Sequence, residues 1–111
     1  MQQFSAVIMD VASTVGAYEY GEAIKCATYS NAIIQVYSPD TGSAQLQVNS
    51  VDDPNIAGTP DDNAWYNVSQ GFAVSAGWEA GFLTPICAKY LRVFWFGAIG
   101  DEVKAVVTLQ G

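Results

Sequence analysis

The stretch Ala44-Gln45-Leu46-Gln47-Val48-Asn49 alternates three apolar side chains with three amides. A period of two residues is typical of a β-strand, because successive side chains of a strand point to opposite faces of the sheet. We therefore expect Ala44, Leu46 and Val48 to face a hydrophobic core while the amides face outward. The segment predicts a half-buried strand.

The same alternation occurs on both sides of this stretch. Residues 103–109 repeat it, with Val103, Ala105, Val107 and Leu109 expected to point inward. Residues 32–37 are also rich in β-branched side chains, and Ser38-Pro39-Asp40-Thr41-Gly42 follows them with the residues of a tight turn. Residues 32–49 are therefore predicted to form a hairpin.

Residues 89–96 have the β-branched and aromatic content of a strand, but both faces are apolar. Leu91, Val93 and Trp95 are expected to fill the core. The opposite face carries Tyr90, Phe94 and Phe96, with Arg92 as its one charge, and it needs a cover. Either a loop of the same chain, such as residues 76–85, or a neighbouring subunit could supply this cover. Gly97 and Gly100-Asp101 predict a turn into residues 103–109 and thus a second hairpin.

Shorter strand candidates are residues 20–26, 65–69 and 72–76. The N-terminal stretch, with Phe4, Val7, Ile8 and Val11, fits a helical face as well as a strand, but its β-branched content favours a strand. The total of seven or eight short strands predicts one domain over residues 1–111. We expect an all-β, antiparallel β-sandwich of jelly-roll type.

Composition excludes several functions. The 111 residues include 4 Lys plus Arg, 11 Asp plus Glu and no histidine, for a net charge of -7. Catalysis by Ser-His-Asp, Cys-His or His-bound metal is therefore excluded, and no basic patch exists for nucleic acid. A glycosidase with two carboxylates would need a cleft that a small sandwich has little material to build. We expect no enzymatic activity and no cofactor.

The N-terminal residues lack the basic region of a secretion signal, since Met1-Gln2-Gln3-Phe4-Ser5-Ala6-Val7-Ile8-Met9-Asp10 carries no Lys or Arg. The strongly apolar run at residues 93–99 is also far shorter than the roughly 20 residues that span a bilayer. We expect a chain made in soluble form in the cytoplasm, with no membrane partner.

Two further sets of residues leave alternatives open. Cys26 and Cys87 both lie in apolar surroundings, as expected for two buried free thiols or for a disulfide. The longest irregular segment, residues 51–64, contains Asp52, Asp53, Asp61 and Asp62. Four carboxylates suit Ca²⁺, but the spacing is not that of an EF-hand loop, so we expect turn-forming aspartates and no metal site.

Large aromatic residues beside glycines are the strongest candidates for contacts. Trp78-Glu79-Ala80-Gly81-Phe82-Leu83 is predicted to be a Gly-flanked loop, where Trp78 could stack on a sugar, enter a neighbour's pocket or cover one end of the sandwich. Tyr18 and Tyr20 allow the same three interpretations. The candidate interaction surface comprises Tyr18, Tyr20, Trp78, Phe82, Tyr90, Arg92, Phe94 and Phe96.

Residues 43–111 follow an order of motifs found in known jelly rolls. The order begins with the strand at residues 44–49 and Ser50. It continues with Asp52-Asp53, Trp65-Tyr66-Asn67-Val68, Phe82, Pro85-Ile86, Ala88-Lys89-Tyr90-Leu91-Arg92-Val93 and a closing strand. This order resembles discoidin-like, galactose-binding-type jelly rolls. It is also similar to small β-sandwich virion proteins of tailed bacteriophages.

The chain departs from the discoidin-like pattern in three respects. Discoidin-like domains are usually longer, Lys89 replaces the first Arg of the motif, and residues 54–63 form a Pro-rich insertion. The short length and the missing secretion signal favour the phage-type protein.

The resemblance implies a non-enzymatic structural component of a phage virion: a capsid decoration, head-fibre or neck/tail accessory protein. Its expected partners are other virion proteins and copies of itself. The alternative is a small carbohydrate-binding module of discoidin-like type that binds a glycan, and a generic bacterial interaction domain comes third.

Overall fold

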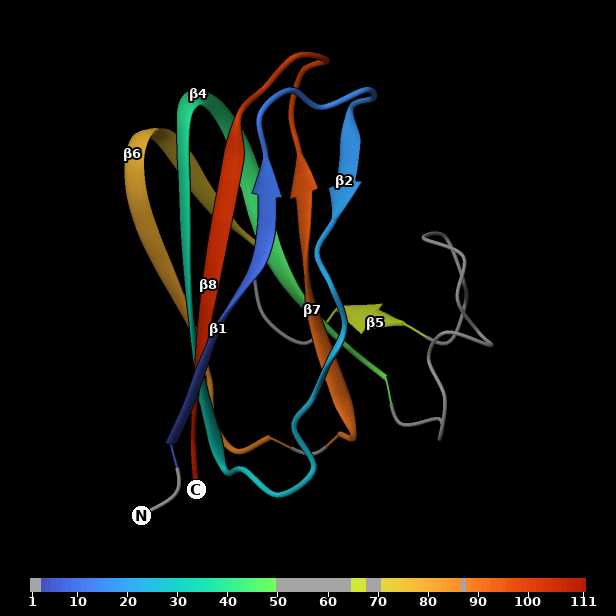
Figure 1. The fold of residues 1–111 in the computed structure, drawn as a ribbon, viewed down its shortest axis with the longest axis vertical. Helices are drawn as coiled ribbons and strands as arrows, with labels where there is room; N and C mark the ends of the chain where they lie inside the picture. The colour runs from blue at the N-terminus through green and yellow to red at the C-terminus, as the bar shows by residue number, and fades with distance from the viewer. Residues whose placement is uncertain (1–2, 50–64, 68–70, 87) are drawn as a thin grey trace.

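The computed structural model describes residues 3–49, 65–67, 71–86 and 88–111. In this part of the chain all regular structure is β (Figure 1), and no helix there could cross a membrane. The strands are β1 (Gln3–Val11), β2 (Tyr18–Tyr20), β3 (Ile24–Lys25), β4 (Asn31–Asn49), β5 (Tyr66–Asn67), β6 (Phe72–Leu83), β7 (Tyr90–Phe96) and β8 (Val103–Gln110). The predicted all-β, antiparallel sandwich is confirmed, as is the N-terminal strand.

One antiparallel sheet curls into two layers. In the first layer, β1 pairs with β8, β8 with the first half of β4, and that half with the second half of β6. In the second layer, β2 and β3 pair with β7, and β7 pairs with the second half of β4. On its other edge, the second half of β4 pairs with β5 and with the start of β6.

The predicted hairpin at residues 32–49 is wrong, because β4 continues through the expected turn. The strand bends sharply near the end of the sandwich (Figure 1), and its two halves lie in different layers. β6 bends with it and stays paired from Ala32↔Leu83 to Ala44↔Phe72, with a register shift between Ser38 and Thr41. The ladder therefore supplies backbone hydrogen bonds on both sides of the bend, which sequence alone does not reveal.

Gly42 is needed at this bend for packing. A Cβ on this residue would overlap the indole ring of Trp95 and the carbonyl oxygen of Phe96. The glycine that predicted a turn therefore allows a close approach between β4 and β7.

The predicted second hairpin is also wrong, because β7 and β8 belong to different layers and do not pair with each other. The connection between them is fixed by the buried side chain of Asp101. Its Oδ2 accepts hydrogen bonds from the Ala98 backbone N–H at 2.8 Å and from Trp95 Nε1 at 3.3 Å. The Thr14 hydroxyl accepts the backbone N–H groups of Gly100 and Asp101, both at 3.1 Å. These bonds hold the chain in a path across the end of the sandwich.

The predicted loop at residues 76–85 is wrong as well, since residues 76–83 belong to β6. The glycines that suggested a loop are strand residues. Gly81 is required because the ring of Phe72, from the other half of β6, occupies the space that a Cβ would fill. The predicted strand at residues 72–76 is thus the start of a longer one.

The predicted strand at residues 20–26 is interrupted between β2 and β3. Gly21 lies against the Ile8 carbonyl, and the Glu22 N–H donates to that oxygen at 2.7 Å. The chain therefore leaves β7 to contact β1 and returns to β7 at Ile24.

Of the predicted strand at residues 65–69, β5 covers Tyr66–Asn67, and residues 68–69 lie outside the described part of the chain.

The core lies between the layers and is made by the predicted inward positions. Leu91, Val93 and Trp95 of β7 are fully buried. They pack with the buried side chains of the other long strands, among them Ile34, Leu46, Val103, Ala105, Val107 and Leu109.

Ala76 is a strained position at the bend of β6. Its φ of 53° lies in the left-handed region, where a Cβ costs roughly 1 kcal/mol. We expect Ala76→Gly to raise the free energy of unfolding by about 0.5 to 1 kcal/mol, measured by urea denaturation. The control, Ala73→Gly, places glycine at a β6 residue without positive φ and should lower stability by a similar amount. Destabilisation by both substitutions would contradict the assignment of strain.

Candidate interaction surfaces

Six of the eight predicted contact residues gather on one surface, the outer side of the second layer. This β7 face consists of Tyr18, Tyr20, Tyr90, Arg92, Phe94 and Phe96. Four of them belong to β7, and they point outward because the side chains that alternate with them are in the core. Pairing of β2 with β7 adds the tyrosines, with Tyr18 opposite Phe96 and Tyr20 opposite Phe94.

The aromatic rings of the β7 face partly cover one another. The Tyr18 ring centroid lies 5.1 Å from that of Phe96 and 5.6 Å from that of Phe94, and the Tyr20 centroid lies 5.1 Å from that of Phe94. All three pairs are tilted, which aromatic rings favour over face-to-face stacking. The proposed cover by residues 76–85 is wrong, since β2 provides the neighbouring rings. Tyr18 remains 57% exposed and Phe96 45% exposed.

Arg92 is held between two aromatic rings and is 6% exposed. Its Cζ lies 4.3 Å from the ring centroid of Tyr20 and 4.2 Å from that of Trp65. Its Nε donates to Gln47 Oε1 at 2.8 Å. Facing rings and a hydrogen-bond acceptor stabilise a cation that has lost most of its water. Arg92 therefore links β7 to β2, to β4 and to the segment before β5. The sequence did not predict the contacts of Arg92 with Trp65 and Gln47. The local pattern shows neither the register between β4 and β7 nor the position of Trp65.

Trp78 and Phe82, the other two predicted residues, lie on the outer side of the first layer. There Trp78 pairs with Tyr37 and Phe82 with Ile33 across β4 and β6. The same outer surface continues over β8 to Val106 and over β1 to Val7, which pair with each other. We call these six residues the β6 face.

The β6 face exposes large apolar side chains to solvent. Phe82 is 65% exposed, Val7 60% and Trp78 54%. The rings of Tyr37 and Trp78 lie 5.3 Å apart at an interplanar angle of 40°. Sequence reasoning missed Tyr37, Ile33, Val7 and Val106. The alternation in residues 32–37 marks Ile33 and Tyr37 as outward, but they join Trp78 only once β6 is assigned as a strand.

Some predicted features lie outside the described residues. Asp52, Asp53, Asp61, Asp62 and Cys87 are among them. Within the described ranges, no group of three or more acidic or sulfur side chains gathers as a metal site would require. Cys26 is a buried free thiol that donates to the Ala88 carbonyl at 3.5 Å.

Burial raises the pKa of the Cys26 thiol from 9.0 to about 11. The unfolded thiol loses its proton near pH 9, whereas the folded one keeps it to about pH 11. The contribution of the Cys26 thiol to the free energy of unfolding is therefore fully present below pH 9. It falls as pH rises from 9 to 11. Denaturation of wild type and Cys26→Ala under reducing conditions should show their stability difference shrinking by about 1 to 2 kcal/mol over this range. Parallel stability curves for the two proteins would refute the expectation.

The sequence matches no protein-family model and no curated protein. In three dimensions the chain is similar to the PBSX exported protein XepA, a phage protein, with a TM-score of 0.69 and 12% identity over 97% of this chain. The matched region is 37% of XepA. The chain is also similar to a family 29 carbohydrate-binding module from Piromyces equi, at a TM-score of 0.47 and 14% identity, covering 100% of this chain and 93% of that one. PirA gives a TM-score of 0.47 and 10% identity, covering 97% and 93%. The similarity to XepA at this identity shows the fold.

Proposed function

We propose that this chain is a non-enzymatic structural component of a phage virion that docks through its β6 face. It acts as a capsid decoration, head-fibre or neck/tail accessory protein, in contact with other virion proteins and with copies of itself. The observation that carries the proposal is the exposure of Val7, Trp78 and Phe82 on one side of one layer.

The physical argument rests on the cost of leaving this surface in water. Apolar side chains that are exposed singly are common, but several on one face of a layer, here spread over four strands, are typical of an interaction site. Strand pairing holds the β6 face in a fixed shape, so docking would order few additional groups. Trp78 and Tyr37 are of the residue types that contribute most to interface stability.

Two further observations support the virion role. XepA, a phage protein, uses this fold within a longer chain. The net charge of -7 suits a protein that must stay dissolved before it joins a particle and must avoid a packaged genome. Both observations suit a protein that is made in free form and then joins a particle.

Oligomeric state and particle composition test the proposal together. Native mass spectrometry or light scattering of the purified chain is expected to give a closed oligomer, such as a trimer or pentamer. Mass spectrometry of purified particles is expected to find the chain in stoichiometric amount. A strict monomer that is absent from particles would overturn the proposal.

Trp78→Ala should separate association from folding. Because Trp78 is 54% exposed and lies outside the core, we expect the melting temperature to change little and the dissociation constant of the assembly to rise about tenfold or more. The matched control is Phe96→Ala on the β7 face, which should leave association through the β6 face unchanged. A large loss of melting temperature in Trp78→Ala would show that the ring is structural.

A carbohydrate-binding module is the second candidate, favoured by the adjacent rings of Trp78 and Tyr37. An exposed aromatic pair can stack against the apolar face of a sugar ring. A glycan array decides between the candidates. Monomeric protein that binds a glycan, and loses it in Trp78→Ala, would favour the module, whereas a stable oligomer without glycan binding would favour the virion role.

A further inference from the structure

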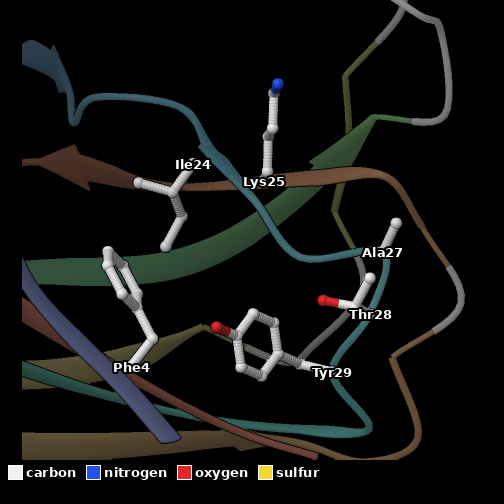
Figure 2. Close-up of a pocket in the computed structure, with 6 residues that line it drawn as sticks. All are labelled: Phe4, Ile24, Lys25, Ala27, Thr28 and Tyr29. Carbon is white, nitrogen blue, oxygen red and sulfur yellow. The ribbon is translucent and has the colours of Figure 1, made fainter. Parts of the chain in front are cut away.

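The two layers meet at a junction between β1 and the segment that links β2 to β3. The junction is the hydrogen bond from the Glu22 N–H to the Ile8 carbonyl, 2.7 Å long, which ties the chain between β2 and β3 to β1. Toward the start of β1 and the residues after β3 lies a pocket of about 470 Å³ (Figure 2). This β1–β3 pocket is lined by Phe4, Ile24, Lys25, Ala27, Thr28 and Tyr29.

The walls of the β1–β3 pocket are mainly apolar. Phe4 and Ile24 face the space between the layers, since their cross-strand partners are the buried residues Leu109 and Leu91. Figure 2 shows the Tyr29 ring beside that of Phe4, with its hydroxyl directed toward Phe4. A pocket of a few hundred Å³ with apolar walls and a few hydroxyl groups is typical of a small-molecule site.

Lys25 is the cationic residue in the lining of this pocket. An adjoining hollow of about 340 Å³ is lined by Lys25, Ala27, Lys89 and Tyr90, so it shares two residues with the β1–β3 pocket. Lys25 thus borders both hollows of a chain whose net charge is -7. The Lys25 ammonium points away from Phe4 and Tyr29 (Figure 2), so a bound anionic group would meet it at the rim.

We propose that the β1–β3 pocket binds a small amphiphile with an apolar body and one carboxylate. The body lies between Phe4, Ile24 and Tyr29. The carboxylate passes the edge of β3, which is only two residues long, and meets Lys25. Lys25 selects an anionic head group, because this cation attracts an anion locally on a chain whose net charge is negative. The site is separate from the β6 face and does not depend on the virion role.

Isothermal titration calorimetry of the full chain tests the proposal with three probes. Octanoate, kept below its micelle-forming concentration, supplies both tail and charge, octan-1-ol supplies the tail alone, and acetate supplies the charge alone. We expect saturable one-site binding of octanoate at low salt, about fivefold or more weaker binding of octan-1-ol, and none of acetate. Absence of saturable octanoate binding, or equal affinity for octan-1-ol, would overturn the proposal.

Substitutions assign the binding to these residues. Lys25→Gln is expected to weaken octanoate binding about five- to tenfold, whereas Lys104→Gln, on β8, should leave it unchanged. Tyr29→Ala removes one wall and should weaken binding about tenfold, with Tyr66→Ala on β5 as its control. Equal effects of the two lysine substitutions would mean unspecific attraction and would refute the site. NMR shifts of the Phe4 and Tyr29 amides in the wild-type chain locate the ligand without any substitution, and shifts confined to other residues would also refute it.

Discussion

Trp95→Ala is expected to lower the free energy of unfolding by about 3 to 5 kcal/mol, which is enough to unfold much of a domain of this size. The indole ring is fully buried between the layers, so its removal leaves a cavity that the surrounding strands cannot close. It also removes the Nε1–H group that donates to Asp101 Oδ2 at 3.3 Å. Urea denaturation followed by circular dichroism measures the loss.

Phe96→Ala is the matched control for this prediction. Phe96 lies next to Trp95 in β7 but points outward and is 45% exposed, so the expected loss is about 1 kcal/mol. Trp95→Phe separates ring volume from hydrogen bonding, because it keeps much of the apolar volume and removes the donor to Asp101. A loss from Phe96→Ala as large as that from Trp95→Ala would mean that the inward and outward faces of β7 are assigned wrongly.

The second large effect is expected from Arg92→Ala, at about 2 to 3 kcal/mol of lost stability. The substitution opens the space between the Tyr20 and Trp65 rings and removes the donor to Gln47 Oε1. Interactions of a desolvated cation with two rings, together with a hydrogen bond to a charged group, account for a loss of this size. Denaturation at low and at high salt measures it, with little change expected between the two because the cation is buried.

Two variants make the Arg92 prediction specific. Arg92→Lys keeps the charge but lacks the planar guanidinium and the Nε donor, so its stability should lie between wild type and Arg92→Ala. Lys104→Ala removes an exposed cation from β8 and should change stability by less than about 0.5 kcal/mol. If Lys104→Ala were as damaging as Arg92→Ala, the loss would come from the net charge of the chain and not from the ring contacts.

The sequence predicted those parts of the fold that depend on local alternation. Ala44, Leu46 and the inward side of β7 are in the core as expected, because a period of two needs no knowledge of the partner strand. The same reasoning placed Tyr90, Arg92, Phe94 and Phe96 together on the outward side of β7. Tyr18 and Tyr20 were included on their aromatic character, and strand pairing then placed them beside Phe94 and Phe96.

The errors share one physical origin, which is that glycine has more than one structural role. Gly42 and Gly81 were interpreted as signs of a turn and a loop, but each lies in a strand where an aromatic ring needs the space of a Cβ. Local sequence cannot distinguish these roles, because the rings that need the space, those of Trp95 and Phe72, belong to other parts of the sheet. The second half of β6 was therefore missed as a strand, and with it the pairing that places Tyr37 beside Trp78 and Ile33 beside Phe82.

The shared bend of β4 and β6 has a mechanical consequence. Each of these strands contributes hydrogen bonds to both layers, so neither layer can slide or separate without breaking the ladder that the two strands form. A load applied to the β6 face is therefore transmitted through continuous backbone to the strand that flanks β7. A protein built in this way resists shear between its two outer surfaces by its chain connectivity as well as by the packing of its core.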